Sequence, residues 1–283
     1  MNKTFGILLK IVFVYICTDL LNVPFFVIAA LCGMDIDSSA SHILASLGSD
    51  SVNSLFVLSA ELVSFGGILL CMYFVVRREG KSLKDIGFIK VRYFFVIGSG
   101  IILGFINVLA FLGIDTALGN HTSFLGYQNV NIALYYGVGA AVYWIDALSE
   151  ELLFRAFIAV ELLKILPKET AAFVSAIFFG LVHIFNPGYS IETIIILVAS
   201  GYVWALMYYE TRSIWVTTAF HFGYNFAIFA LRIAPQDPAT PFWSIQTPVS
   251  TAAYITVIFL IYFAWKRYLK KYVVVAEVSA VVN

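Results

Sequence analysis

Long apolar segments are the feature that most limits how this chain can fold. They lie near residues 5–33, 54–76, 93–115, 131–163, 169–185, 191–210, 213–232 and 250–265. An α-helix of roughly 20 apolar residues is long enough to cross the hydrocarbon core of a bilayer. Because 61% of the residues are hydrophobic and only 12% are charged, the sequence predicts an all-α polytopic membrane protein with about eight transmembrane helices.

Lysine and arginine residues are concentrated in alternate loops between these segments. The basic stretches are 77–92, 164–168, 212 and 266–271, whereas 34–53, 116–130, 186–190 and 234–248 contain no Lys or Arg. Basic loops stay in the cytoplasm, so we predict an integral membrane protein with both termini cytoplasmic. The 17 Lys and Arg residues balance the 17 Asp and Glu residues, and this balance gives no indication of a nucleic acid partner.

Three short polar motifs interrupt the apolar sequence. The first is Glu150-Glu151-x-x-x-Arg155, the second Phe179-x-x-x-His183 and the third His221-x-x-x-Asn225. An ionisable side chain at bilayer depth costs at least about 2.5 kcal/mol. Three such motifs on separate segments therefore predict a polar catalytic chamber inside the bundle.

The domain organisation follows from the same pattern. No repeat or linker divides the sequence, so we predict a single integral membrane domain over residues 1–283. Residues 131–232 carry all three motifs, and we assign the catalytic helices to them. Three cysteines, Cys17, Cys32 and Cys71, lack metal-type spacing. The tail at 272–283 has no function that we can assign.

Helical spacing predicts how the first two motifs are used. Glu151 and Arg155 are four residues apart and can pair along one face, whereas Glu150 lies about 100° round the helix and stays available. A free carboxylate of this kind is suited to taking a proton from water. His183 follows Phe179 by one turn, so the ring can fix its rotamer. Each set also has a structural interpretation. Glu150, Glu151 and Arg155 could form an ion cluster that stabilises the helix, and His183 could form a hydrogen bond that joins two membrane helices.

The third motif predicts an oxyanion site. His221 and Asn225 share a helix face and can both donate hydrogen bonds into one small volume. Two such donors stabilise a tetrahedral anion by about 3 to 4 kcal/mol each.

Measured from Lys164 and Lys168, Glu150 and His183 lie at similar depths, about 21 to 23 Å along their helices. We therefore expect them to meet.

In this order, on separate apolar segments, the three motifs resemble those of the CAAX protease and bacteriocin-processing family, also called Abi, of intramembrane glutamate proteases. The resemblance, closest to the CAAX prenyl protease 2 type, implies an eight-helix endopeptidase. It implies that Glu150 is the base, that His183 helps to hold the attacking water, and that Glu151 and Arg155 orient the site. His221 and Asn225 are implied as the oxyanion site. The implied substrate is a peptide or protein, lipidated or membrane-bound, such as a CAAX terminus or a bacteriocin leader.

Metal dependence and catalysis itself remain open at this level. Glu150, His183 and His221 could form a three-ligand zinc site. The sequence contains no His-Glu-x-x-His motif, and Asn225 suits an oxyanion better than zinc, so we favour a metal-independent water and commit to no cofactor. The main alternative is a non-catalytic membrane immunity or scaffold protein of the same fold. A proton-coupled transporter would also place carboxylates in helices, but the sequence has no paired interrupted helices.

Overall fold

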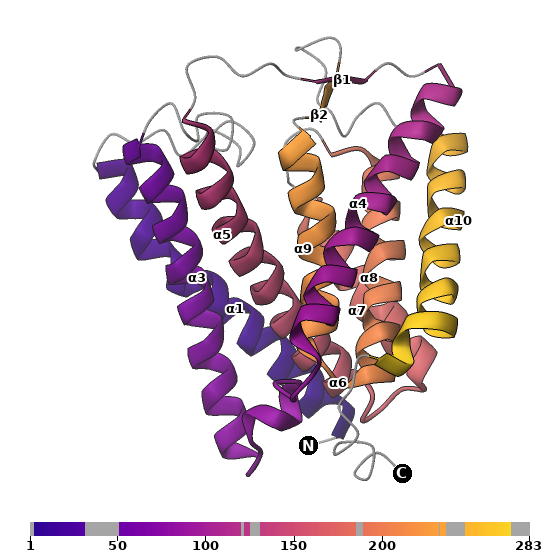
Figure 1. Ribbon diagram of the computed structural model, residues 1–283. Helices are drawn as coiled ribbons and strands as arrows, with labels where there is room; N and C mark the ends of the chain where they lie inside the picture. Colours follow the sequence, from indigo (N-terminus) through magenta and orange to yellow (C-terminus); the bar gives the residue numbers. More distant parts are fainter. Residues whose placement is uncertain are drawn as a thin grey trace.

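The protein forms a bundle of long helices, as the computed structural model shows (Figure 1). The structure describes residues 3–31, 51–119, 122–124, 131–184, 189–231, 233–235 and 247–272. The long helices are α1 (Lys3–Leu31), α3 (Ser51–Arg78), α4 (Tyr93–Ala117), α5 (Ile132–Glu151), α7 (Lys168–Val182), α8 (Ile191–Thr211), α9 (Ile214–Leu231) and α10 (Pro248–Ala264). The predicted all-α polytopic fold is confirmed.

Six of the described helical stretches are long and apolar enough to cross a bilayer. They are Leu58–Arg78, Tyr93–Ala117, Ile132–Leu162, Ile191–Thr211, Ile214–Leu231 and Pro248–Tyr268. Helix α1 has 29 residues and covers residues 5–31 of the first predicted segment. Helix α7 has only 15 residues and ends at Val182, although the sequence predicted a segment running to residue 185. His183 consequently follows the helix as its C-cap.

The helix that carries the first motif continues through a widened turn. After α5, a π-helix, η2 (Leu152–Ala159), leads into α6 (Val160–Leu162). π-turns leave backbone carbonyls without their usual partners and often occur at functional sites. Here Ser175 Oγ donates to the Phe154 carbonyl at 2.9 Å and Tyr209 OH donates to the Ala159 carbonyl at 2.9 Å. Side chains from α7 and α8 thus stabilise the widened turn.

Short elements join the long helices. The 3₁₀ turn η1 (Leu83–Ile86) lies between α3 and α4, while η4 (Trp265–Leu269) and η5 (Lys270–Tyr272) follow α10. Strand β1 (Thr122–Phe124) pairs antiparallel with β2 (Ile233–Pro235), with Ser123 opposite Ala234. The two strands follow α4 and α9 and lie at one end of the bundle (Figure 1). Hydropathy did not predict this pair.

Helix α9 packs closely against α4 because small residues face each other. A Cβ atom at Gly104 would lie 2.2 Å from the Gly223 carbonyl carbon, and one at Gly100 would lie 2.6 Å from the Ala219 backbone. Small residues let membrane helices approach to backbone contact. The position of α9, which carries the third motif, is therefore fixed by α4.

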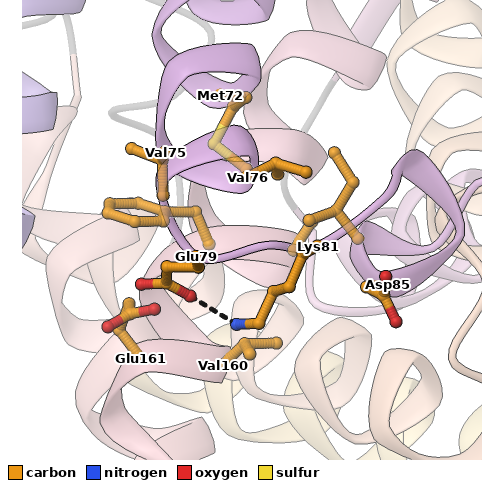
Figure 2. Close-up of a pocket in the computed structure, with 11 residues that line it drawn as sticks. Met72, Val75, Val76, Glu79, Lys81, Asp85, Val160 and Glu161 are labelled. Atoms are coloured by element: carbon orange, nitrogen blue, oxygen red, sulfur yellow. Dashed lines mark hydrogen bonds and ion pairs between the residues drawn. The ribbon is translucent and has the colours of Figure 1, made fainter.

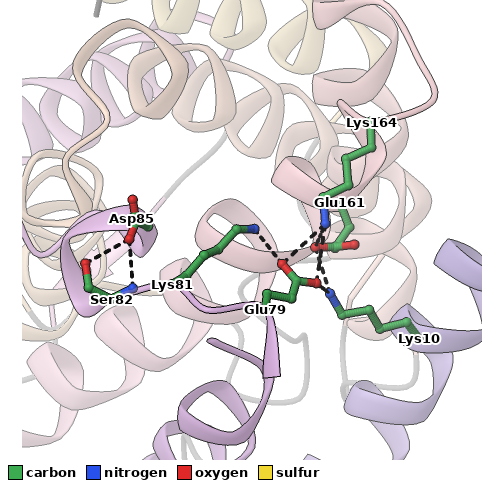
Figure 3. Close-up of polar contacts among 7 residues, drawn as sticks. All are labelled: Lys10, Glu79, Lys81, Ser82, Asp85, Glu161 and Lys164. Atoms are coloured by element: carbon green, nitrogen blue, oxygen red, sulfur yellow. Dashed lines mark hydrogen bonds and ion pairs between the residues drawn. The ribbon is translucent and has the colours of Figure 1, made fainter. Parts of the chain in front are cut away.

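An ion cluster joins α1, the end of α3 and α6 (Figure 3). The end of α3 and α6 lie at the end of the bundle away from the two strands (Figure 1). Glu161, whose side chain is only 4% exposed, pairs with Lys10 at 2.9 Å and Lys164 at 2.5 Å. Glu79 pairs with Lys10, with Lys81 at 2.5 Å and with Lys164 at 3.4 Å. Partial burial raises the pKa of Glu79, but hydrogen bonds from Lys10 and Lys81 and the nearby lysine charges outweigh it and lower the pKa to about 2.

A small cavity lies beside this ion cluster (Figure 2). Its volume is about 20 Å³, enough for about one water molecule. Apolar side chains of α3 and η2, including Met72 and Phe157, line it together with Glu79 and Asp85. Asp85 is held by the backbone N–H and hydroxyl of Ser82, and these hydrogen bonds lower its pKa. No motif residue lines the cavity, so we do not place the reaction there.

Candidate active site

The three motifs meet inside the bundle although they come from different helices. Glu150 lies in the last turn of α5, His183 is the C-cap of α7 and His221 lies in the middle of α9. His183 Nε2 lies 3.3 Å from Glu150 Oε1, and His221 Nε2 lies 3.5 Å from Glu150 Oε2. The Glu150 side chain is 23% exposed and the His221 side chain 4%. The structure thus brings one carboxylate between two imidazoles, and the similar depths of Glu150 and His183 led us to expect the contact between these two.

The other nitrogen of each imidazole is already engaged. His183 Nδ1 lies 2.7 Å from the Phe179 carbonyl oxygen, which can only accept, so Nδ1–H is the donor. His221 Nδ1 lies 3.0 Å from Glu151 Oε1 and donates to that carboxylate. These Nδ1 contacts orient the two rings, and in this orientation both Nε2 atoms face Glu150. Phe179 therefore orients His183 through its backbone carbonyl and also through its ring, 4.9 Å away.

Glu151 and Arg155 form the ion pair that their spacing predicted. Arg155 Nη1 lies 3.0 Å from Glu151 Oε1, and both side chains are fully buried. The guanidinium also lies 4.3 Å from the Phe179 ring centre and 5.1 Å from that of Trp204. Glu151 thus forms an ion pair with Arg155 and accepts a hydrogen bond from His221, and it links the first motif to the third.

Room for Arg155 depends on a glycine of α8. A Cβ atom at Gly201 would lie 3.1 Å from Phe179 Cδ1 and 3.3 Å from Arg155 Nη2. Contacts this short require the neighbouring side chains to shift. Helix α8 carries no motif, yet Gly201 lets it pack against the first two motifs.

Asn225 is hydrogen-bonded to a carboxylate outside the motif residues. Its side chain donates to Asp146, which lies one turn before Glu150 on α5. An amide nitrogen carries two hydrogens, so one N–H of Asn225 remains for another acceptor. Asn225 is thereby joined to the same helix as Glu150.

Other side chains near the motifs were not assigned from the sequence. Glu61 on α3 is close enough to Glu150 and Asp146 to interact with them electrostatically. The sequence did contain a signal for Glu61, because it is a carboxylate within the apolar segment 54–76. No motif links Glu61 to the other site residues. Trp204 stacks on His221 with ring centres 4.1 Å apart, and the Tyr189 ring lies parallel to that of His183 at 6.3 Å. Aromatic residues are common throughout this sequence, so nothing distinguished these two.

The three side chains considered as possible zinc ligands are Glu150, His183 and His221. Across the residues that the structure describes, no group of three or more His, Cys, Asp or Glu side chains is spaced to hold a metal ion. His183 and His221 each face a different oxygen of Glu150, at distances of 3.3 and 3.5 Å. The donor set therefore fits a network of hydrogen bonds, and we route no chemical step through a metal.

Comparison with protein families gives a match over part of the chain. Residues 132–227 match the family described as type II CAAX prenyl endopeptidase, Rce1-like. The matched segment contains all three motifs, and the resemblance predicted from them is confirmed. A search of curated proteins found no match.

Proposed function

Because residues 132–227 match the Rce1-like family of CAAX endopeptidases, we propose that this membrane protein is an intramembrane endopeptidase. It hydrolyses a peptide bond with a water molecule activated by Glu150 and His183. The observation that carries the proposal is the contact of one carboxylate with two imidazoles from different helices. Side chains that are costly in lipid are rarely gathered without a function.

The first chemical step is attack by water. A water molecule next to Glu150 and His183 gives a proton to the Glu150 carboxylate, and its oxygen forms a bond to the carbonyl carbon of the substrate. The electron pair of the carbonyl π-bond moves to the oxygen, which becomes an oxyanion. His183 is held by Phe179 so that its Nε2 faces this reaction, and such positioning removes much of the entropic barrier.

Asn225 and His221 stabilise the oxyanion. Asn225 uses one N–H for Asp146 and has the other available. The Nδ1–H of His221 donates a hydrogen bond to Glu151. The hydrogen bond from His221 to the oxyanion therefore comes from Nε2, in the imidazole form that carries a proton on both nitrogens. When the intermediate collapses, the C–N bond breaks and the proton held by Glu150 passes to the leaving amine.

The family match and the position of the site favour a membrane-associated substrate. The first and third motifs lie in helical stretches that are long and apolar enough to span a bilayer, and His183 at the end of α7 contacts Glu150 of the first motif. A peptide or protein with a lipidated C-terminus, as in CAAX sequences, would reach the site from the membrane. We further propose that both termini are cytoplasmic, since the basic loops fall on that side.

The test uses the full chain, purified in detergent, with an internally quenched peptide that ends in a farnesylated CAAX sequence. We expect the wild-type protein to cleave it and Glu150→Gln to lower kcat by about 10²- to 10⁴-fold. The matched control is Glu169→Gln, which makes the same change at an exposed position in the first turn of α7.

Two outcomes would count against the proposal. Cleavage by Glu150→Gln at the wild-type rate would refute the assigned base. A wild-type protein that binds the peptide without cleaving it, and a Glu150→Gln variant with the same binding, would favour the immunity or scaffold alternative.

A further inference from the structure

We propose that Trp204 is a positioning residue that fixes the plane of the His221 ring and so directs Nε2 at Glu150. This inference rests on the proposed function. Trp204 lies on α8, outside all three motifs, and is 2% exposed. Its ring stacks on the His221 ring with centres 4.1 Å apart and planes 27° apart.

The hydrogen bond to Glu151 is not sufficient to orient His221. That bond holds Nδ1 at 3.0 Å, but the torsion between Cβ and an imidazole ring has broad energy minima. Nε2 lies on the far edge of the ring, so a small turn moves it away from Glu150. A flat side chain packed on one face restricts this turn.

Trp204 is itself held by residues of the first two motifs. The Arg155 guanidinium lies 5.1 Å from its ring centre, and the Phe179 ring packs against it edge-on at 5.9 Å. Phe179 also lies 6.0 Å from His221. Arg155 and Phe179 therefore share a second role, because both support the ring that supports His221.

The indole nitrogen indicates that ring contact explains the tryptophan. Trp204 Nε1 is buried and has no hydrogen-bond partner among the described residues. Burying an unpaired N–H is unfavourable, and an aliphatic side chain such as leucine would fill the space without it. A residue that only fills space would not need an indole here, whereas a residue that supports an imidazole needs a broad flat face.

The first experiment measures kinetics with the quenched farnesylated peptide. We expect Trp204→Leu, which has no flat face, to lower kcat by about 10- to 100-fold with little change in KM. Trp204→Phe keeps an aromatic face and should retain most of the activity. Tyr208→Leu is the matched control, since Tyr208 is fully buried one turn further along α8. It should lose stability but keep kcat and the wild-type pH profile.

The second experiment does not depend on activity. The full chain is labelled with ¹⁵N-histidine in micelles, and the His221 ring nitrogens are assigned with His221→Gln. We expect Trp204→Leu to shift or broaden the His221 signals and to leave those of His183 nearly unchanged, while Trp204→Phe resembles the wild type.

The two readouts separate this inference from the proposed function. Unchanged His221 signals together with wild-type kcat in Trp204→Leu would overturn the inference, even if Glu150→Gln remains inactive. Loss of kcat in Tyr208→Leu as large as in Trp204→Leu, with equal changes in the His221 signals, would also overturn it. An active Glu150→Gln would overturn the proposed function whatever the spectra show.

Discussion

Replacing Arg155 by methionine tests how strongly the buried ion pair stabilises the bundle. The change keeps much of the side-chain volume and removes the charge 3.0 Å from Glu151. Removing one partner of a buried pair costs about 3 to 5 kcal/mol, because the other charge is left buried and unpaired. Glu151 keeps the hydrogen bond from His221. We therefore expect the lower end of that range, a loss of about 3 kcal/mol in the free energy of unfolding.

The assay is unfolding by SDS in mixed micelles, followed by circular dichroism. The control is Lys266→Met, which breaks an ion pair with Glu210 of similar length, 3.1 Å, in which the Lys266 side chain is 45% exposed. An exposed pair contributes about 0 to 1 kcal/mol. The two ion pairs have nearly the same N–O distance but differ in burial. Arg155→Met should therefore lose more unfolding free energy than Lys266→Met.

A double variant tests whether the unpaired charge of Glu151 causes the loss of stability in Arg155→Met. If Glu151 is also changed to Gln, the buried charge disappears and the amide oxygen can still accept from His221. Arg155→Met with Glu151→Gln should then be more stable than Arg155→Met alone by at least about 1 kcal/mol. The reasoning would be refuted by a double variant that is no more stable, or by an Arg155→Met loss as small as that of Lys266→Met.

Two further predictions concern the ion cluster and the packing of α8. The pKa of Glu79 is lowered from 4.5 to about 2, so its contribution to stability is fully present above about pH 4.5 and is lost as the pH falls towards 2. Melting temperatures from pH 7 to pH 2 should fall less steeply for Glu79→Gln than for the wild type, and parallel curves would contradict this. Gly201→Ala would crowd Phe179 and Arg155, and we expect kcat to fall by up to about 10-fold. Gly113→Ala, at a site with nothing within 4 Å, should not change kcat, and equal effects of the two variants would contradict the packing argument.

The helices, the pair between Glu151 and Arg155 and the contact of Glu150 with His183 were predictable because they depend on spacing along the helices. Apolar runs located the long helices, and the separation of four residues predicted the pair between Glu151 and Arg155. The end of α7 differed from prediction because apolar sequence continues past Val182 while the helix does not. The helix-stopping sequence Asn186-Pro187-Gly188 was a signal for this earlier end.

The contacts that orient the site could not be predicted because they join residues distant in sequence. Trp204 meets His221 only through the packing of α8 on α9. Asp146 was visible as one turn before Glu150, but its hydrogen bond to Asn225 depends on how α5 faces α9. The π-turn after Glu151 likewise depends on carbonyl partners from α7 and α8.

The strand pair after α4 and α9 has a mechanical consequence for the bundle. Close contact at Gly104 and Gly223 and the register of β1 on β2 both oppose sliding of α9 along α4. We therefore expect these contacts to hold His221 and Asn225 at one depth. Helix α1, by contrast, is joined to α6 through charged side chains such as Lys10 and Glu161, and ion pairs can separate without disturbing backbone packing. Any parting of helices that admits a substrate should begin on the α1 side, while α4 and α9 act as the stationary wall.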